Sequence, residues 1–171
     1  AWGRGSAAFA YIIYAPFAHT FRKSKGGLFM LGILTALLSG ALMSVQGVFN
    51  TEASKNAGLW TATCFVQFSA LCVCLVFWFF TGRTSFGELF AMPHKWALLG
   101  GVLGAFITVT VIKSMASLGP ARAAMLIVTS QILVAYVIEL LGWFGTQQQP
   151  FEWKKVWGML LTILGIIIFK W

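Results

Sequence analysis

Five polar side chains stand inside long apolar stretches of this sequence, where polar side chains are uncommon. They are Gln46, Asn50, Gln67, Gln131 and Glu139. An amide can donate and accept hydrogen bonds, and a carboxylate can accept them or exchange a proton. In apolar surroundings such groups need partners, on a neighbouring helix or on a bound ligand. The residue types therefore allow two interpretations, a small-molecule binding site or hydrogen bonds that hold helices together.

The spacing of these side chains suggests which of them act together. One stripe, at steps of four, three and four residues, consists of Ser39, Met43, Gln46 and Asn50. This spacing places the stripe on one face of a helix. Gln67 belongs to a weaker stripe, for which helix packing is the favoured interpretation. Gln131 and Glu139 are eight residues apart, roughly 80° around a helix at 100° per residue.

Glu139 could couple transport to protons, because a proton-coupled carrier needs a carboxyl group for which a proton and a cation compete. However, Trp143 follows only four residues later. Tryptophan prefers the level of the lipid headgroups, where a carboxylate can be hydrated. Both roles for Glu139, coupling group and solvated interfacial residue, follow from the sequence.

Five apolar runs supply the helices that must position these groups. They cover residues 28–49, 59–81, 96–115, 122–142 and 154–169. A helix of about 20 apolar residues crosses a hydrocarbon layer of about 30 Å. Trp60 and Trp78 are 18 residues apart, or roughly 27 Å along a helix, as expected for tryptophans at opposite membrane faces. The predicted fold is an all-α, polytopic transmembrane bundle with five spans.

The composition supports an integral membrane protein. Hydrophobic residues make up 59% of the 171 positions and charged residues only 9%, against about 25% charged in soluble domains. The net charge of +8 is expected to reflect basic loops at an anionic cytoplasmic leaflet, so the lipid bilayer is the expected partner and nucleic acid is not. We expect residues 1–27 to form an interfacial helix or a tail, and residues 28–171 to form one transmembrane domain.

Small residues at steps of three or four predict places where helices approach closely. They include Gly40, Gly100, Gly101 and Gly104. Such glycines serve packing within one chain or a face between two chains. The sequence contains no phosphate-binding glycine loop, no cluster of metal ligands and no Ser-His-Asp set. We therefore expect no enzyme activity, no bound metal and no cofactor.

Several segments together resemble one family of membrane proteins. They are Gln46-Gly-Val-Phe-Asn50, His94-Lys-Trp-Ala-Leu-Leu-Gly-Gly-Val-Leu-Gly104, Leu118-Gly119, and Gln131 followed eight residues later by an acid and then by Gly142-Trp143-Phe144-Gly145. From about Leu28 onward the chain resembles the YdcZ family, short five-helix inner-membrane exporters of the drug/metabolite transporter (DMT) superfamily. That family usually has Asp, often followed by His, where this chain has Glu139-Leu140. The resemblance implies a bacterial inner-membrane exporter.

The expected function is export of a small-molecule substrate by alternating access as a dimer, with proton coupling as one form of it. An odd number of spans would give an inverted repeat if two such units were fused. A five-helix chain is therefore expected to form a homodimer or to pair with a paralogous chain. The alternative is a non-transporting membrane subunit or scaffold, whose intramembrane polar groups only join helices.

Lysine and arginine positions predict the orientation of the chain. With a cytoplasmic amino terminus, eight basic residues lie inside and four lie outside, the four being Lys55, Lys113, Arg122 and Lys170. An excess of basic residues marks the cytoplasmic side. Reporter fusions after Lys25 and after Trp171 should therefore report opposite sides of the membrane, with the first cytoplasmic. The same side for both reporters would contradict five spans.

Overall fold

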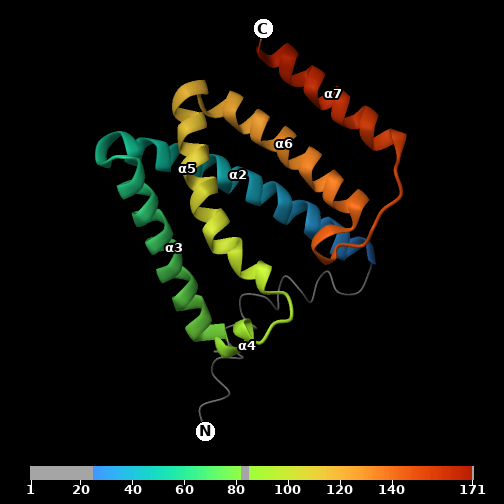
Figure 1. The fold of residues 1–171 in the computed structure, drawn as a ribbon. Coiled ribbons are helices and arrows are strands. Elements are labelled where there is room, and N and C mark those ends of the chain that lie inside the picture. Colours follow the sequence, from blue (N-terminus) through green and yellow to red (C-terminus); the bar gives the residue numbers. More distant parts are fainter. Residues whose placement is uncertain (1–24, 82–84, 171) are drawn as a thin grey trace. The chain divides into compact units, whose positions relative to one another are not determined.

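The computed structural model describes residues 25–81 and 85–170 (Figure 1). Every regular element in these two stretches is a helix, which confirms the all-α class. In chain order the elements are α2 (Lys25–Ala57), α3 (Leu59–Thr81), α4 (Gly87–Phe90), the 3₁₀ helix η1 (Lys95–Leu99), α5 (Gly100–Leu118), α6 (Pro120–Leu141), the 3₁₀ helix η2 (Trp143–Gly145) and α7 (Trp153–Lys170). An interfacial helix or tail is predicted at residues 1–27. Positions 1–24 of it lie outside the described residues, and positions 25–27 belong to α2.

Four segments among the described residues are long and apolar enough to cross a membrane. They are Phe29–Ala57, Leu59–Thr81, Lys95–Leu118 and Pro120–Leu141. These segments confirm a polytopic membrane protein. The fifth predicted span corresponds to α7, which has 18 residues and carries Lys154, Lys155 and Lys170 close to its ends. Lysines at span ends commonly extend their ammonium groups to the interface, and crossing by α7 stays a prediction.

The first predicted span ends at residue 49, but α2 continues as helix to Ala57. No glycine or proline occurs between Asn50 and Ala57, so nothing local stops the helix. The ammonium of Lys55 also lies 2.9 Å from a carboxylate oxygen of Glu52, three residues earlier, a pairing that supports helix. The helix ends only at Gly58, and α3 begins at the next residue.

The described chain forms two compact units, with the boundary between Ile112 and Lys113, inside α5. In the first unit, α2 and α3 meet at a sharp bend and diverge away from it (Figure 1). In the second unit, α6 and α7 lie side by side and run antiparallel (Figure 1). Each unit is therefore built on a helical hairpin.

The bend between α2 and α3 is a single residue, Gly58, with φ of +85°. Its N–H donates to the carbonyl of Ser54 at 2.9 Å, and its carbonyl accepts from the N–H of Ala62 at 3.0 Å. A side chain at positive φ clashes with its own backbone, so glycine suits this joint. Asn50 and Ala62, on either side of the joint, are 8% and 3% exposed. The contact between the two helices is therefore concentrated near the bend.

Gly119 joins α5 to α6 in the same way, with φ of +81°. Its N–H donates to the carbonyl of Met115 at 3.0 Å, and its carbonyl accepts from the N–H of Ala123 at 3.1 Å. Ala123 is fully buried. Pro120 occupies the first position of α6, where a missing N–H costs no helical hydrogen bond. Both joints place a buried alanine four residues after a glycine with positive φ.

Most large apolar side chains in the described residues are exposed within the single chain. Leu37, Phe65 and Ile168 are 68%, 70% and 76% exposed. Apolar exposure on this scale is characteristic of helices that face lipid or further helices. The exposure pattern therefore agrees with an integral membrane protein.

Replacing Gly58 with alanine should destabilise the protein, because alanine at left-handed φ costs about 1–2 kcal/mol. The measurement is the thermal unfolding midpoint of the detergent-solubilised protein. The control is Gly158→Ala within α7, where no atom lies within 4 Å of the added Cβ and alanine is the better helix former. Equal midpoints for the two variants would contradict the joint described above.

Candidate functional site

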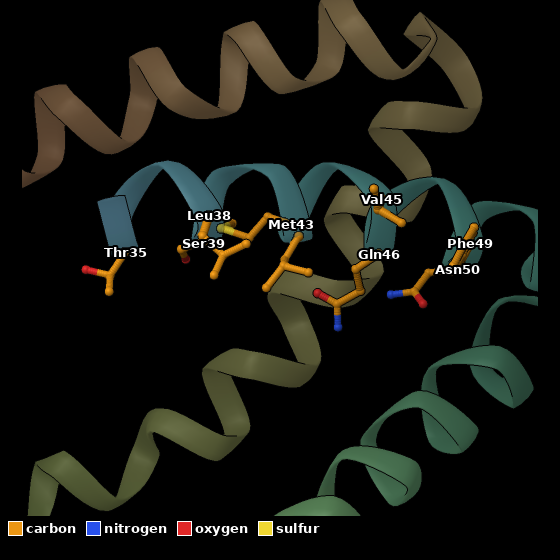
Figure 2. A pocket seen from close by; sticks show the side chains of 9 residues that line it. Thr35, Leu38, Ser39, Met43, Val45, Gln46, Phe49 and Asn50 are labelled. Carbon is orange, nitrogen blue, oxygen red and sulfur yellow. The ribbon is translucent and has the colours of Figure 1, made fainter. Parts of the chain in front are cut away.

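One face of α2 forms a groove of about 570 Å³. Small-molecule sites commonly enclose about 300–1,000 Å³, so the groove is large enough for a small ligand. Its lining residues all belong to α2 and are Thr35, Leu38, Ser39, Leu42, Met43, Val45, Gln46, Phe49 and Asn50. Figure 2 shows the side chains of Thr35, Met43, Gln46 and Asn50 projecting from the same side of the helix. Because one helix supplies the whole lining, the groove is open along its side.

The polar stripe predicted from the sequence lies in this groove. Ser39, Met43, Gln46 and Asn50 all line it, as their helical spacing predicts. Thr35 extends the same face by one further turn, at a step of four residues before Ser39. Of the predicted site residues, Gln46 and Asn50 line the groove, whereas Gln67 and Gln131 do not.

Three polar groups in the groove have no hydrogen-bond partner among the described residues. They are the hydroxyl of Ser39 and the side-chain amides of Gln46 and Asn50. Asn50 is only 8% exposed, yet no described side-chain nitrogen or oxygen is both fully buried and unpaired. The Asn50 amide is therefore still partly accessible, and Asn50 is one of the residues that line the groove. By contrast, the hydroxyl of Thr35 donates to carbonyls of its own helix at 2.9 and 3.0 Å.

Gln67 lies on α3, is half-buried and does not line the groove. Its Nε2 atom lies 3.7 Å from the position that a Cβ would occupy at Gly104. A Cβ added at Gly104 would therefore make only an ordinary van der Waals contact with the Gln67 amide, which shows that this amide lies beside α5. The other predicted packing glycines, Gly40, Gly100 and Gly101, have no atom within 4 Å of such a Cβ. Close approach at these three positions stays a prediction.

Gln131 and Glu139 lie on α6, in the second unit, and both are exposed. The Gln131 amide has no hydrogen-bond partner within the described stretches. Glu139 does have a charged partner, because one carboxylate oxygen lies 3.9 Å from the ammonium of Lys155 on α7. The side chains of Lys155 and Glu139 are 37% and 49% exposed, and ion pairs at such exposure contribute about 0–1 kcal/mol.

Lys155 also contacts two further groups. Its ammonium lies 3.6 Å from a carboxylate oxygen of Glu152 and 5.6 Å from the ring centroid of Tyr136. The phenol oxygen of Tyr136 accepts a hydrogen bond from the backbone N–H of Glu152 at 3.1 Å. We call Tyr136, Glu139, Glu152 and Lys155 the α6–α7 cluster. The sequence did not identify Lys155 as a partner of Glu139, because their pairing requires the hairpin.

The segment after α6 turns back and satisfies the end of that helix. Gly142, Phe144 and Gly145 have φ of +64°, +57° and +79°, which reverses the chain direction. Carbonyls in the last turn of a helix lack helical partners. Here the N–H of Gln149 donates to the backbone carbonyl of Glu139 at 3.0 Å. The side-chain amide of Gln148 donates to the backbone carbonyl of Leu140 at 3.1 Å. The turn therefore fixes the backbone on which Glu139 lies.

Comparison with known proteins places this arrangement in a family. Residues 31–168 match the family described as "Putative inner membrane exporter, YdcZ". The chain belongs to this family. The YdcZ match includes the whole α2 groove and the whole α6–α7 cluster, and it confirms the resemblance seen in the sequence motifs.

A curated member of the YdcZ family is also similar to the chain. The inner membrane protein YdcZ of Escherichia coli (strain K12) is 26% identical over 90 residues, which cover 53% of this chain and 60% of that protein. The matched part is thus less than two thirds of the relative's length. No solved structure matches the chain significantly. Membership in the YdcZ family therefore supports an integral membrane protein of the inner membrane.

Proposed function

We propose that this chain is a carrier, and not an enzyme, that exports small molecules across a bacterial inner membrane by alternating access. Family membership supports export and the inner membrane. The observation that carries the proposal is the α2 groove, in which the nearly buried Asn50 keeps an unpaired amide. An unpaired amide in a membrane helix is unfavourable unless water, a ligand or another helix supplies the missing partner.

The free polar groups of the groove form a series along the helix axis. Ser39 and Asn50, with Gln46 between them, are eleven residue steps apart, or about 17 Å at 1.5 Å per residue. The hydrocarbon core is about 30 Å thick. A solute moving along α2 would therefore find hydrogen-bonding groups over about half of the apolar layer, where it loses its hydration.

We propose that a second chain supplies the opposite wall of this path. The lining of the groove comes from α2 alone, whereas a carrier must enclose its solute between two surfaces that open alternately. A second copy, or a paralogous chain, would complete the enclosure. Native mass spectrometry of the solubilised protein measures this association directly, and a monomer that still transports in liposomes would exclude it.

The alternative function, a scaffold, is favoured by one contact. Gln67 packs beside Gly104, as expected for a polar group that joins helices. The unpaired amides of Gln46 and Asn50 favour the carrier, because the described helices of this chain make no hydrogen bond to either amide. A transport measurement on variants of the groove separates the two functions.

Asn50→Ala should abolish export while leaving the protein in the membrane. Host cells expressing the chain should accumulate less of at least one compound from a chemically diverse panel than cells with an empty vector, as measured by mass spectrometry. Asn50→Ala should remove that difference, because alanine has no amide to offer the solute. Asn56→Ala is the matched control, since the Asn56 amide lies outside the groove and bonds to the carbonyl of Glu52 at 3.0 Å.

Membrane fractions should contain the unmodified chain, Asn50→Ala and Asn56→Ala at equal levels. If no compound distinguishes expressing cells from control cells, or if Asn50→Ala exports as the unmodified chain does, the scaffold becomes the better proposal.

We further propose that Glu139 couples export to protons. Its carboxylate is half exposed and close to Lys155, so a proton or a cation can compete with that ammonium for it. Glu139→Gln keeps the shape but cannot exchange a proton, and should abolish flux driven by a pH gradient in proteoliposomes. Glu139→Asp should retain part of the flux, because the resembled family commonly has Asp at this position.

The matched control for coupling is Glu152→Gln. It removes the other carboxylate beside Lys155, at a position outside α6, and should leave the pH dependence in place. An unchanged pH dependence in Glu139→Gln would show that Glu139 is only an interfacial ion-pair residue.

A further inference from the structure

We infer that the α2 groove selects uncharged amphiphiles, which enter it from the bilayer and present a hydrogen-bonding group to Gln46 and Asn50. The inference names the substrate class of the exporter and so rests on the proposed function for its role in transport. As a statement about binding, it stands on the groove alone.

The lining carries no charge. None of the nine residues of the groove is acidic or basic. The nearest charged residues along α2, Glu52 and Lys55, do not line the groove and are paired with each other at 2.9 Å. A charged ligand would therefore give up its hydration without gaining a counter-charge from α2, which is strongly unfavourable in apolar surroundings. A neutral ligand meets no such penalty.

The polar end of the groove has a defined chemistry. Gln46 and Asn50 are one helical turn apart, and neither amide has a partner in the described residues. Each amide has both donor and acceptor atoms. A ligand group that also donates and accepts, such as a carboxamide or an alcohol, can satisfy both side chains. A purely apolar ligand would leave the Asn50 amide unpaired, and sites built to hydrogen-bond a ligand strongly reject analogues that lack the bonding group.

The remainder of the groove is apolar. Its lining there includes Leu38, Leu42 and Met43, with the free hydroxyl of Ser39 among them. The flexible thioether side chain of methionine adapts to ligands of varied shape. A ligand with an alkyl or aryl body and a polar head therefore matches the whole length of the groove better than a compact polar solute does.

The groove is open along its side. All of its lining belongs to one helix, and no other element of the first unit contributes a residue to it. A molecule dissolved in the bilayer can therefore reach the groove laterally whenever the second chain of the proposed function does not close over it, with its body already in the apolar layer. Lateral entry favours amphiphiles over solutes that stay in water.

The test is direct binding to the full chain in nanodiscs of phosphatidylcholine, measured by scintillation proximity with tritiated probes. The three probes are decanamide, decylamine as its ammonium form, and decanoate, which share a ten-carbon body and differ in charge. We expect saturable binding of decanamide above that to empty nanodiscs. The two charged probes should bind the unmodified chain about tenfold more weakly than decanamide does, because they lose hydration without a counter-charge. Decanamide should also bind Asn50→Ala about tenfold more weakly than the unmodified chain, since one hydrogen bond to a buried polar group is worth about that factor.

Two variants make the result independent of folding effects. Asn56→Ala, outside the groove, should bind decanamide as the unmodified chain does. Asn50→Asp introduces the missing charge, and should bind decylammonium more tightly than the unmodified chain while losing affinity for decanamide. Tighter binding of either charged probe to the unmodified chain, no saturable decanamide binding, or equal binding by Asn50→Ala would overturn the inference.

The binding inference and the proposed function can fail separately. Export of a charged compound that depends on Asn50 would overturn the substrate class and leave the exporter in place. Saturable decanamide binding together with no export of any compound in the cell assay would overturn the exporter and leave the groove as a binding site.

Discussion

Hydrocarbon offers no hydrogen-bond partners, and this constraint explains most features of the structure. Helices satisfy their own backbone groups, and several hydroxyls, such as those of Thr63 and Thr129, donate to carbonyls one turn earlier in the same helix. The carbonyls at the end of α6 are satisfied by the segment that folds back over them. Because these polar groups all have hydrogen-bond partners within the chain, a nearly buried polar group without a partner indicates a place where another molecule can bind.

Polar side chains of the α6–α7 cluster are paired, whereas those of the α2 groove are not. In the second unit, Tyr136, Glu152 and Lys155 connect α6 to α7, so that their hydrogen bonds and charges are used within the hairpin. In the first unit, Gln46 and Asn50 remain available. The α6–α7 cluster therefore connects the two helices of a hairpin and holds the Glu139 carboxylate near the Lys155 ammonium, while the lining of the α2 groove carries no charge.

The sequence predicts faces well and ends poorly. The span at 59–81 agrees with α3, because apolar character begins and stops there together with the helix. The four positions of the stripe from Ser39 to Asn50 line one face of α2, because helical spacing alone fixes a shared face. The end of α2 was misplaced because polar residues after Asn50 are compatible with helix, and only Gly58 stops it. The pairing of Glu139 with Lys155 could not be foreseen, since it depends on how the segment between α6 and α7 folds back.

The length of α2 has a mechanical consequence. Its 33 residues correspond to about 50 Å, roughly 20 Å more than the hydrocarbon thickness. The excess must be taken up by tilt or by projection of an end into the headgroup region. The groove follows one side of this helix, so a change in tilt alters the depth at which Asn50 lies. Bilayer thickness, and thus the lipid composition of the host membrane, therefore becomes a physical variable that sets the depth of the groove in the membrane.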